Sequence, residues 1–375
     1  MVALGALIHQ AKTIRCGDGD YPVLSMTMHD GLVFQDEKFK KVIASNDRTD
    51  YKIVKRNQLV ISFPIDEGVL AAQRIVDAGI VSPAYGIWDI DHGKILPEFL
   101  EYALRCDRAL SYYKAKLRGS TARRRSLPTP TLLAYTVPLP AVSEQKHILD
   151  VIHKVKGVIS GYAEQIILLN NLIKARFVEM FESCSCDTVK AGSLFQTIRN
   201  GVSPSIHGTY TAKVLTLSAI TQGAFDKSAW KNGMFDEPPA DDKRVNKTDL
   251  YICRGNGNKA LVGTAAYSKH DYPDLVFPDT IIAASVDTSK IRLPYLFYAW
   301  KHPTVRMQIE SGARTTNGTF KVNQKTLSEI EVMLPPLELQ EQFAAFVEQT
   351  DKSKVIVPIK HRIPYEYYMK WREPS

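Results

Sequence analysis

The long helix predicted for this chain lies in residues 139–182, which read LPAVSEQKHILDVIHKVKGVISGYAEQIILLNNLIKARFVEMFE. Apolar residues recur there in alternating steps of four and three, which is the spacing of a heptad seam. The seam consists of Ile148, Ile152, Val155, Ile159, Tyr162, Ile166, Leu169, Ile173 and Met180, and only Arg176 interrupts it. A helix from Ser143 to Glu182 would be about 60 Å long at 1.5 Å per residue, so we expect it to separate two domains. The alternative is a long core helix within one large domain.

The sequence on one side of this helix resembles the sequence on the other side. The matching segments are 21–34 with 213–225, 95–103 with 291–299, and 131–145 with 326–342. The offset stays close to about 195 residues, far longer than a solenoid repeat, so each copy is expected to be a whole domain. We therefore predict a first domain in 1–138, a central helical spacer in 139–190, a second domain in 191–333, a short second spacer helix in 334–357 and a tail in 358–375.

The first domain is predicted to mix strands and helices. Short or alternating apolar runs at 21–28, 58–63 and 80–90 are typical of strands. Leu96-Pro97 predicts the start of a helix, because proline is well tolerated in a first helical turn.

Paired motifs connect this organisation to a known family. Leu139-Pro140 with Glu144-Gln145, and Leu334-Pro335 with Glu341-Gln342, each open a heptad helix. The second domain also contains the phrases Arg199-Asn200-Gly201 and 313–318, which reads ARTTNG. In order, duplication and spacer position, nearly all of residues 1 to 350 resemble the specificity subunit of type I restriction-modification systems.

The resemblance implies an α+β fold, in which two similar mixed α/β target-recognition domains are separated by long helices that form an antiparallel coiled coil. It also implies a non-catalytic subunit that reads a bipartite target in double-stranded DNA and directs methylation and restriction by partner subunits. The expected partners are two methyltransferase subunits and, in the full complex, restriction subunits, and S-adenosylmethionine and ATP are expected on those partners. The seam residues of the central helix from Ile148 to Ile173, together with Phe343 and Phe346, are the expected spacer or partner-binding positions.

Composition agrees with these expectations. The net charge of +8 over 375 residues suits a polyanionic partner. No apolar run approaches the roughly 18 residues of a membrane span, and the first residues lack the features of a signal peptide, so we expect a cytoplasmic protein. The five scattered cysteines predict reduced thiols, and no metal site is expected because Cys184 and Cys186 have no histidine nearby.

Candidate DNA contacts in the first domain lie in its basic segment. Residues 108–143 contain seven arginines and lysines and no acidic residue. The candidates there are Lys116, Arg118, Ser120, Thr121, Arg123, Arg124 and Arg125. The alternative is a solvated basic loop without a ligand.

The second domain has a polar loop at the equivalent position, residues 311–319, and a glycine-rich cluster, 254–259, after a predicted strand at 249–253. Arginine can hold guanine with two hydrogen bonds, asparagine can pair with adenine, and hydroxyl groups reach phosphate. The candidates are Arg199, Asn200, Arg254, Asn256, Asn258, Lys259, Arg314, Thr315, Thr316, Asn317 and Lys321. For the 254–259 cluster the alternative is a polar turn without a ligand.

Motifs for catalysis within this chain are missing. Residues 255–260 fit a loose dinucleotide fingerprint, but residues 261–268 are β-like where a helix is required. Residues 237–240 lack the asparagine or aspartate and the aromatic of an amino-methyltransferase, and 241–243 lack an upstream aspartate for a nuclease. These absences favour a binding subunit over the alternative, an enzyme with its own nuclease or methyltransferase site fused to duplicated DNA-recognition domains.

The second heptad helix is short. It begins at Leu337, but Thr350 and Ser353 occupy seam positions and Pro358 blocks further helix. Two interpretations of this short helix and the following tail remain open: the gene end is shortened or recombined, or the aromatic residues of the tail cover the exposed seam or dock a partner. Those residues are Tyr365, Tyr367, Tyr368 and Trp371.

Overall fold

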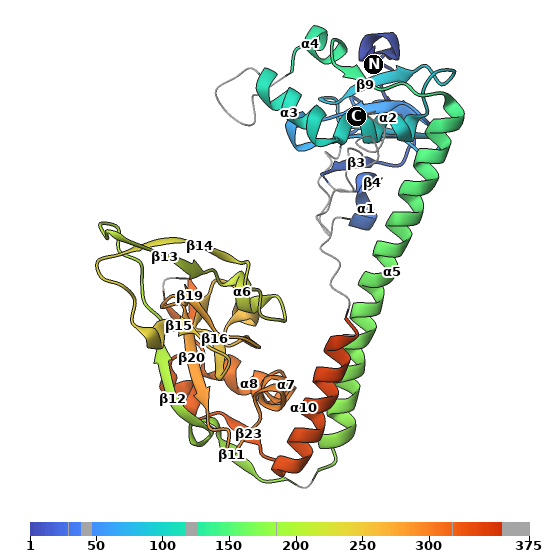
Figure 1. Ribbon diagram of the computed structural model, residues 1–375. Coiled ribbons are helices and arrows are strands. Elements are labelled where there is room, and N and C mark those ends of the chain that lie inside the picture. The colour runs from blue at the N-terminus through green and yellow to red at the C-terminus, as the bar shows by residue number, and fades with distance from the viewer. Residues whose placement is uncertain (29, 39–46, 118–126, 185, 317, 355–375) are drawn as a thin grey trace, which may run out of the picture. The chain divides into compact units, whose positions relative to one another are not determined.

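The computed structural model describes residues 1–354 except 29, 39–46, 118–126, 185 and 317, and it describes Thr316 by its backbone alone. The described chain forms two compact units (Figure 1). The first contains Met1–Tyr162 and the second continues from Ala163, so the boundary falls inside helix α5 (Val142–Phe181). The predicted spacer is therefore a single helix of 40 residues that contributes to both units.

The first unit mixes short strands with short helices, as its sequence predicts. Its elements are β1 (Val2–Ala3), η1 (Leu4–Ala6), β2 (Ile8–Gln10), β3 (Leu24–Thr27), β4 (Gly31–Phe34), α1 (Gln35–Lys38), β5 (Lys52–Lys55), β6 (Leu59–Ile61), η2 (Ile65–Glu67), β7 (Leu70–Ala72), β8 (Ala78–Val81), β9 (Gly86–Ile90), α2 (Pro97–Arg105), α3 (Asp107–Lys116), α4 (Thr129–Leu133) and β10 (Thr136–Val137). The main sheet has the antiparallel order β2-β9-β6-β7. Two hairpin-like pairs, β3 with β4 and β5 with β8, are joined by a parallel bridge between Val23 and Ile80.

The second unit repeats most of these elements in the same sequence order and contains additional ones. They are β11 (Thr188–Lys190), η4 (Ala191–Leu194), β12 (Phe195–Asn200), β13 (Tyr210–Leu215), α6 (Ser218–Thr221), β14 (Trp230–Phe235), η5 (Asp241–Lys243), β15 (Arg244–Val245), β16 (Asp249–Cys253), β17 (Gly255–Asn256), η6 (Lys259–Leu261), β18 (Ala265–Tyr267), β19 (Tyr272–Val276), β20 (Ile281–Val286), α7 (Leu293–Ala299), α8 (Pro303–Gly312), β21 (Arg314–Thr316), β22 (Thr319–Lys321), α9 (Gln324–Ser328), β23 (Glu331–Met333) and α10 (Leu337–Lys352). Its main sheet has the order β12-β20-β16-β18, and a second sheet has the order β14-β13-β19-β15.

Strand pairing confirms the duplication. The order β12-β20-β16-β18 corresponds strand by strand to β2-β9-β6-β7, and all of these pairs are antiparallel. The parallel contact of β13 with β19 corresponds to the bridge between Val23 and Ile80. Equivalent helices also begin with proline, Pro97 in α2 and Pro294 in α7, where the missing backbone N–H costs no hydrogen bond.

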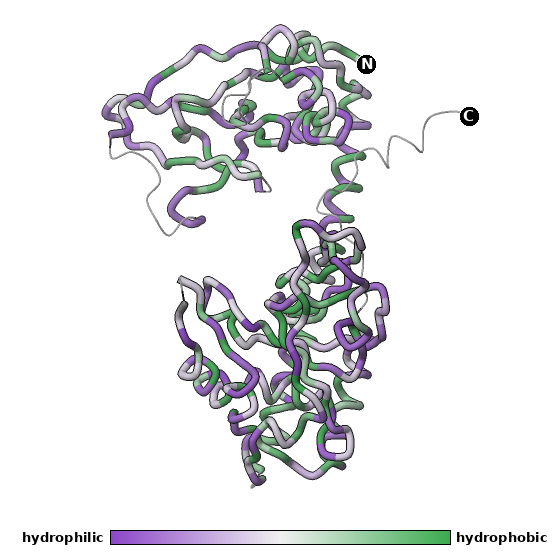
Figure 2. Tube along the Cα trace, turned by 90° about the vertical axis from the view of Figure 1, so that its left-hand side faces the viewer, coloured by the Kyte–Doolittle hydropathy of each residue, from purple (hydrophilic) through white to green (hydrophobic). Residues whose placement is uncertain are grey.

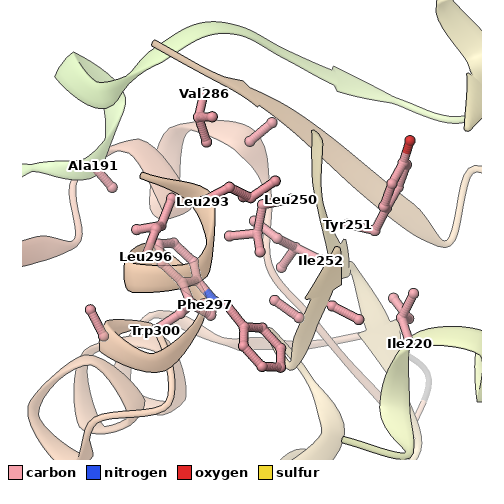
Figure 3. Close-up of a cluster of buried hydrophobic side chains, with 14 of the residues drawn as sticks. Ala191, Ile220, Leu250, Tyr251, Ile252, Val286, Leu293, Leu296, Phe297 and Trp300 are labelled. Carbon is pink, nitrogen blue, oxygen red and sulfur yellow. The ribbon is translucent and has the colours of Figure 1, made fainter. Parts of the chain in front are cut away.

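Each unit has its own hydrophobic core. In the first unit, Phe99 and Leu104 of α2 and Tyr113 of α3 are fully buried together with Ile148 and Ile152 of α5. In the second unit, α7 packs against β16, and Figure 3 shows Leu296 and Trp300 facing Leu250 and Ile252. Burial of side chains of this size stabilises by about 1.5–3 kcal/mol each, so these clusters account for much of the cohesion of each unit.

A glutamine near the start of α5 and one near the start of α10 make equivalent hydrogen bonds in the two units. The Gln145 side chain accepts from Leu96 N at 2.8 Å and donates to Lys94 O and Pro140 O. Gln340 accepts from Arg292 N at 2.8 Å and donates to Lys290 O and Pro335 O. The counterpart of Gln145 is therefore Gln340, and the sequence pairing with Gln342 is wrong, because Gln342 lies on the exposed side of α10.

Helix α10 packs antiparallel to the end of α5. The Phe343 ring lies 5.4 Å from Phe177 and 5.6 Å from Phe181, whereas Arg176, earlier in α5, lies over the later Phe346 ring. The most buried positions here are Ile173, Phe177 and Phe181, spaced by four, so the predicted step from Ile173 to Met180 missed Phe177 and Phe181, although Met180 packs half-buried against the same core. Aromatic contacts with α10 and with Tyr295 of α7 set this register.

The middle of α5 is covered less. Ile159, Tyr162, Ile166 and Leu169 are half-buried, and Val155 is exposed. The other exposed apolar residues of this stretch are Val158, Ile167, Leu168 and Leu172. Figure 2 shows hydrophobic and hydrophilic residues interspersed along the helix.

The cysteine prediction is partly wrong. Cys16, Cys106 and Cys253 are buried free thiols, but Cys184 and Cys186 form a disulfide. Their Cα atoms lie 5.3 Å apart in the link that follows α5, which is within bridging distance. Among the described residues, no cluster of three histidine, cysteine or acidic side chains could hold a metal ion, and no helix is long and apolar enough to cross a membrane.

Candidate DNA interface

The second unit brings its two predicted clusters together in a small sheet. Strand β17 of the 254–259 cluster pairs antiparallel with β22, and β22 pairs antiparallel with β21. Gly255 faces Lys321, and Asn256 faces Phe320. Segments about sixty residues apart in the sequence therefore lie side by side as the order β17-β22-β21.

The β21–β22 ribbon has two different faces. Arg314 lies directly opposite Lys321, and both are exposed. Because side chains alternate along a strand, Phe320 points to the other face, where it packs against the core of the unit. Gly318 has a φ of 74°, which suits the tight turn between the two strands. One face of the ribbon is thus anchored, and the other presents two cations to solvent.

Arg254 joins this small sheet to the main sheet. Its backbone N donates to Thr280 O at 2.9 Å, and its backbone O accepts from Val322 N at 2.9 Å. Its guanidinium donates to Asp279 O at 3.1 Å, and the Asp279 carboxylate lies at 4.0 Å. The side chain is half-buried, so Arg254 combines a structural contact with partial access to solvent.

The two asparagines of the cluster build the turn after β17. The Asn256 Oδ1 accepts from Asn258 N at 2.9 Å, and the Asn258 Oδ1 accepts from Ala260 N at 3.0 Å as the cap of η6. Arg306 of α8 donates to Val262 O at 2.9 Å and to Ala260 O at 3.2 Å. The carboxamide oxygens are therefore engaged, and the exposed Lys259 sits on a turn that is fixed from both sides.

The side chain of Arg199 bonds to residues inside the second unit. Its guanidinium lies 2.6 Å from the Asp249 carboxylate and 2.9 Å from Ser285 Oγ, and its Nε donates to Asp242 O at 2.7 Å. The side chain of Arg199 is 15% exposed and that of Asp249 is 0% exposed. Burial and then the Asp249 charge raise the pKa of Tyr251 well above its ordinary value, so this phenol stays protonated and donates to Asp249. The donors of Arg199 thus have partners inside the fold.

The next two residues explain why the Arg-Asn-Gly phrase is needed here. The Asn200 Oδ1 accepts from Gln324 Nε2 at 3.3 Å, which ties the end of β12 to the segment after β22. A Cβ on Gly201 would lie 2.1 Å from Pro278 O and 2.3 Å from Phe277 O. Only glycine permits this approach, so the Arg-Asn-Gly sequence has a structural role in the fold.

The remaining predicted contacts are placed as follows. Lys116 is exposed in the last turn of α3, a helix equivalent to α8, so the basic segment and the ribbon follow matching helices. Thr315 is exposed beside Arg314. Arg118, Ser120, Thr121, Arg123, Arg124, Arg125 and Asn317 lie outside the described residues, and so does the tail from Val355. The contacts of Arg306 and Gln340 were missed by sequence reasoning, since their partners are distant in the chain.

Comparison with known proteins gives the following relatives. Residues 198–361 match the family described as the type I restriction modification DNA specificity domain. The chain is 22% identical over 265 residues to the specificity subunit of type I restriction enzyme StySPI from Salmonella potsdam. That alignment covers 64% of this chain and 56% of the relative, so the match spans little more than half of the relative's length.

Two solved structures share the fold. The type I restriction-modification S subunit from M. genitalium has a TM-score of 0.50 at 15% identity, over 94% of this chain and 89% of that one. A chain from a study of complex assembly and conformational transition in a type I restriction-modification system has a TM-score of 0.51 at 16% identity, over 94% of this chain and 90% of that one.

These findings define the class of the second unit as a type I DNA specificity domain. The family match covers residues 198–361, and the curated specificity subunit is similar over 64% of the chain, in agreement with the resemblance that the motifs and the duplication indicate.

Proposed function

We propose that this chain is the DNA-reading subunit of a type I restriction-modification complex. Its two units would each read one half of a bipartite target in double-stranded DNA. Methylation and restriction would be carried out by partner methyltransferase and restriction subunits, which would hold S-adenosylmethionine and ATP, in the cytoplasm. The support is the shared topology of the two units, each with a candidate loop after an equivalent helix, α3 or α8.

The observation that carries the proposal is the pairing of Arg314 with Lys321. Like charges directly opposite each other on a β-ribbon are destabilising. Among the residues that the structure describes, no carboxylate forms an ion pair with either of them. A polyanion that meets this face would relieve the repulsion and release bound counterions, so duplex DNA fits the site.

The candidate residues would contact different parts of the DNA, according to the chemistry of their side chains. Arg314 would hold a guanine edge with two hydrogen bonds, and Lys321 and Lys259 would contact phosphates. Asn256 and Asn258 would offer their side-chain amide N–H groups to DNA, since their Oδ1 atoms already accept hydrogen bonds within the turn. In the first unit, Lys116 and the basic segment after it would take the corresponding place.

The apolar residues in the middle of α5 would be part of the surface for the methyltransferase subunits. Five of them are exposed between Val155 and Leu172. Exposed apolar patches of this kind are typical of protein–protein contacts. The two ends of α5, in contrast, are already buried in the cores of their own units.

The test is to express the chain with its methyltransferase partners in a host free of adenine methylation and to sequence the modified bases. We expect methylated adenines in a bipartite motif with an unspecified gap. The matched control is the chain alone with DNA and radiolabelled S-adenosylmethionine, which should transfer no methyl group. Methyl transfer without a partner would contradict the proposal and favour an enzyme with its own site.

A further inference from the structure

The two units differ in the turn that follows an equivalent strand. Nine positions separate Leu59 in β6 from Gly68, whereas thirteen separate Leu250 in β16 from Gly263. Both glycines have positive φ, 77° and 70°, and each follows a single 3-10 turn. The second unit therefore carries four extra residues, and strand β17 lies within this longer turn.

We propose that β17 is a positioning strand, which holds the β21–β22 ribbon in the orientation that lets it enter the major groove of DNA. The proposal rests on the proposed function and assigns different roles to the three strands of the small sheet. The ribbon contacts the bases, and β17 acts only through the ribbon. A two-stranded β-ribbon fits the major groove, which is about 12 Å wide.

The ribbon needs such support because it is short. Strands β21 and β22 have three residues each, and an isolated two-stranded ribbon is marginal in water. Pairing with β17 adds a third strand on the β22 side. Both turns are closed at their base by an equivalent bond, Ser62 N to Val69 O at 3.0 Å and Cys253 N to Thr264 O at 2.8 Å, but the first unit has no counterpart of β17 among its described residues.

Strand β17 is itself fastened to the core. On one side Arg254 is bonded to Thr280, which immediately precedes β20 of the main sheet, and on the other side Arg306 donates to the carbonyls of Ala260 and Val262. The indole of Trp300, which is 1% exposed, donates to Gly263 O at 2.9 Å. Both ends of the inserted turn are thus bonded to the core. Since β17 also pairs with β22, it fixes the position of the ribbon relative to the core.

Gly255 leaves room for the cation beside it. A Cβ at this position would lie 3.1 Å from Lys321 Cγ, which is tighter than most real contacts, and 3.4 Å from Phe320 O, which is an ordinary contact distance. Gly255, Lys321 and Arg314 form one row across the three strands, on the exposed face. The glycine therefore keeps β17 close to β22 without displacing the Lys321 stem.

The experiment compares Asn256→Pro with Asn256→Ala in the complex with methyltransferase subunits. Both variants lose the carboxamide, but only proline also removes the backbone N–H from the ladder and restricts φ. Two quantities are measured: hydrogen exchange of the β21 and β22 amides, and discrimination between the cognate target and one altered in the second unit's half-site. We expect Asn256→Pro to show faster exchange than Asn256→Ala and about tenfold less discrimination, the size of one lost base contact, because Asn256→Ala already accounts for the loss of the carboxamide.

Discrimination and exchange in Asn256→Pro at the level of Asn256→Ala would overturn the proposal. If that variant does not fold, Gly255→Val decides, with Gly257→Val as control because a Cβ on Gly257 meets nothing within 4 Å. Equal behaviour of these two variants would also overturn it. A wild-type complex that binds all sequences alike would instead refute the proposed function, so the two failures are distinguishable.

Discussion

The turn after β6 and the turn after β16 occupy the same place in two copies of one fold, yet their chemistry is opposite. The first carries Phe63, which is 54% exposed, followed by the acidic Asp66 and Glu67. The second carries Arg254 and Lys259 and has no acidic residue between them. Duplication has thus kept the sheet and helices of each unit, while the turns at the sheet edge changed in length and charge. Recognition can vary there because connecting segments tolerate changes in length and sequence better than the elements that they connect.

The largest expected effect concerns the buried charge pair of the second unit, Arg199 with Asp249. Arg199→Ala leaves the Asp249 carboxylate buried without its cation, so the free energy of unfolding of the second unit should fall by about 3–5 kcal/mol. The corresponding strands of the first unit hold Asp89, which is 40% exposed and accepts from Gln58. Asp89→Ala should cost about 1 kcal/mol or less. Unit-resolved hydrogen exchange in denaturant measures both, and similar losses would remove the contrast.

A smaller effect is expected at the ribbon. Arg314→Ala should cost about 1–3 kcal/mol of binding at one half-site and leave the preference at the other half-site intact. Lys352→Ala is the control, because this lysine is exposed on α10 and pairs with Glu348. Competition binding with targets altered in one half-site measures the difference. Equal weakening on all sequences would make Arg314 a phosphate contact.

Substitutions in the basic segment of the first unit should change DNA binding through charge alone. Changing Arg123, Arg124 and Arg125 to alanine should weaken binding to cognate and unrelated DNA to a similar degree. Each lost phosphate contact should reduce the slope of log affinity against log salt by about 0.9. A salt titration of binding checks this, and an unchanged slope would exclude these residues from the interface.

The smallest energetic effect is expected from lengthening the helix shared by both units. One heptad inserted between Leu169 and Asn170 keeps the phase of the seam and adds about 10 Å. At about 3.4 Å per base pair, the gap of the target should grow by roughly three base pairs while both half-sites stay the same. Methylation sequencing reads the gap directly. A folded variant that binds its partners and keeps the original gap would show that α5 does not set the spacing.

Local patterns were sufficient for the elements and for their duplication. Pro97 and Pro294 mark equivalent helix starts, and the apolar steps along α5 predict a helix of the observed length. These signals depend on residues within one or two turns of each other, which is why they can be read along the chain. The relation between the two halves follows from repeated motifs and needs no knowledge of packing.

The sequence by itself therefore determined the class of fold, the repeat and the family, together with the segments that carry basic and polar residues. Tertiary structure alone decided which of those residues face solvent. Arg199 and Arg314 are the same residue type in similar polar phrases, but Arg199 meets Asp249 fifty positions away and is buried, whereas Arg314 meets Lys321 and is exposed. The reason is that pairing between distant strands is set by the register of the whole core. No local pattern encodes that register, and for the same reason Gln340, β17 and Arg306 were visible only after folding.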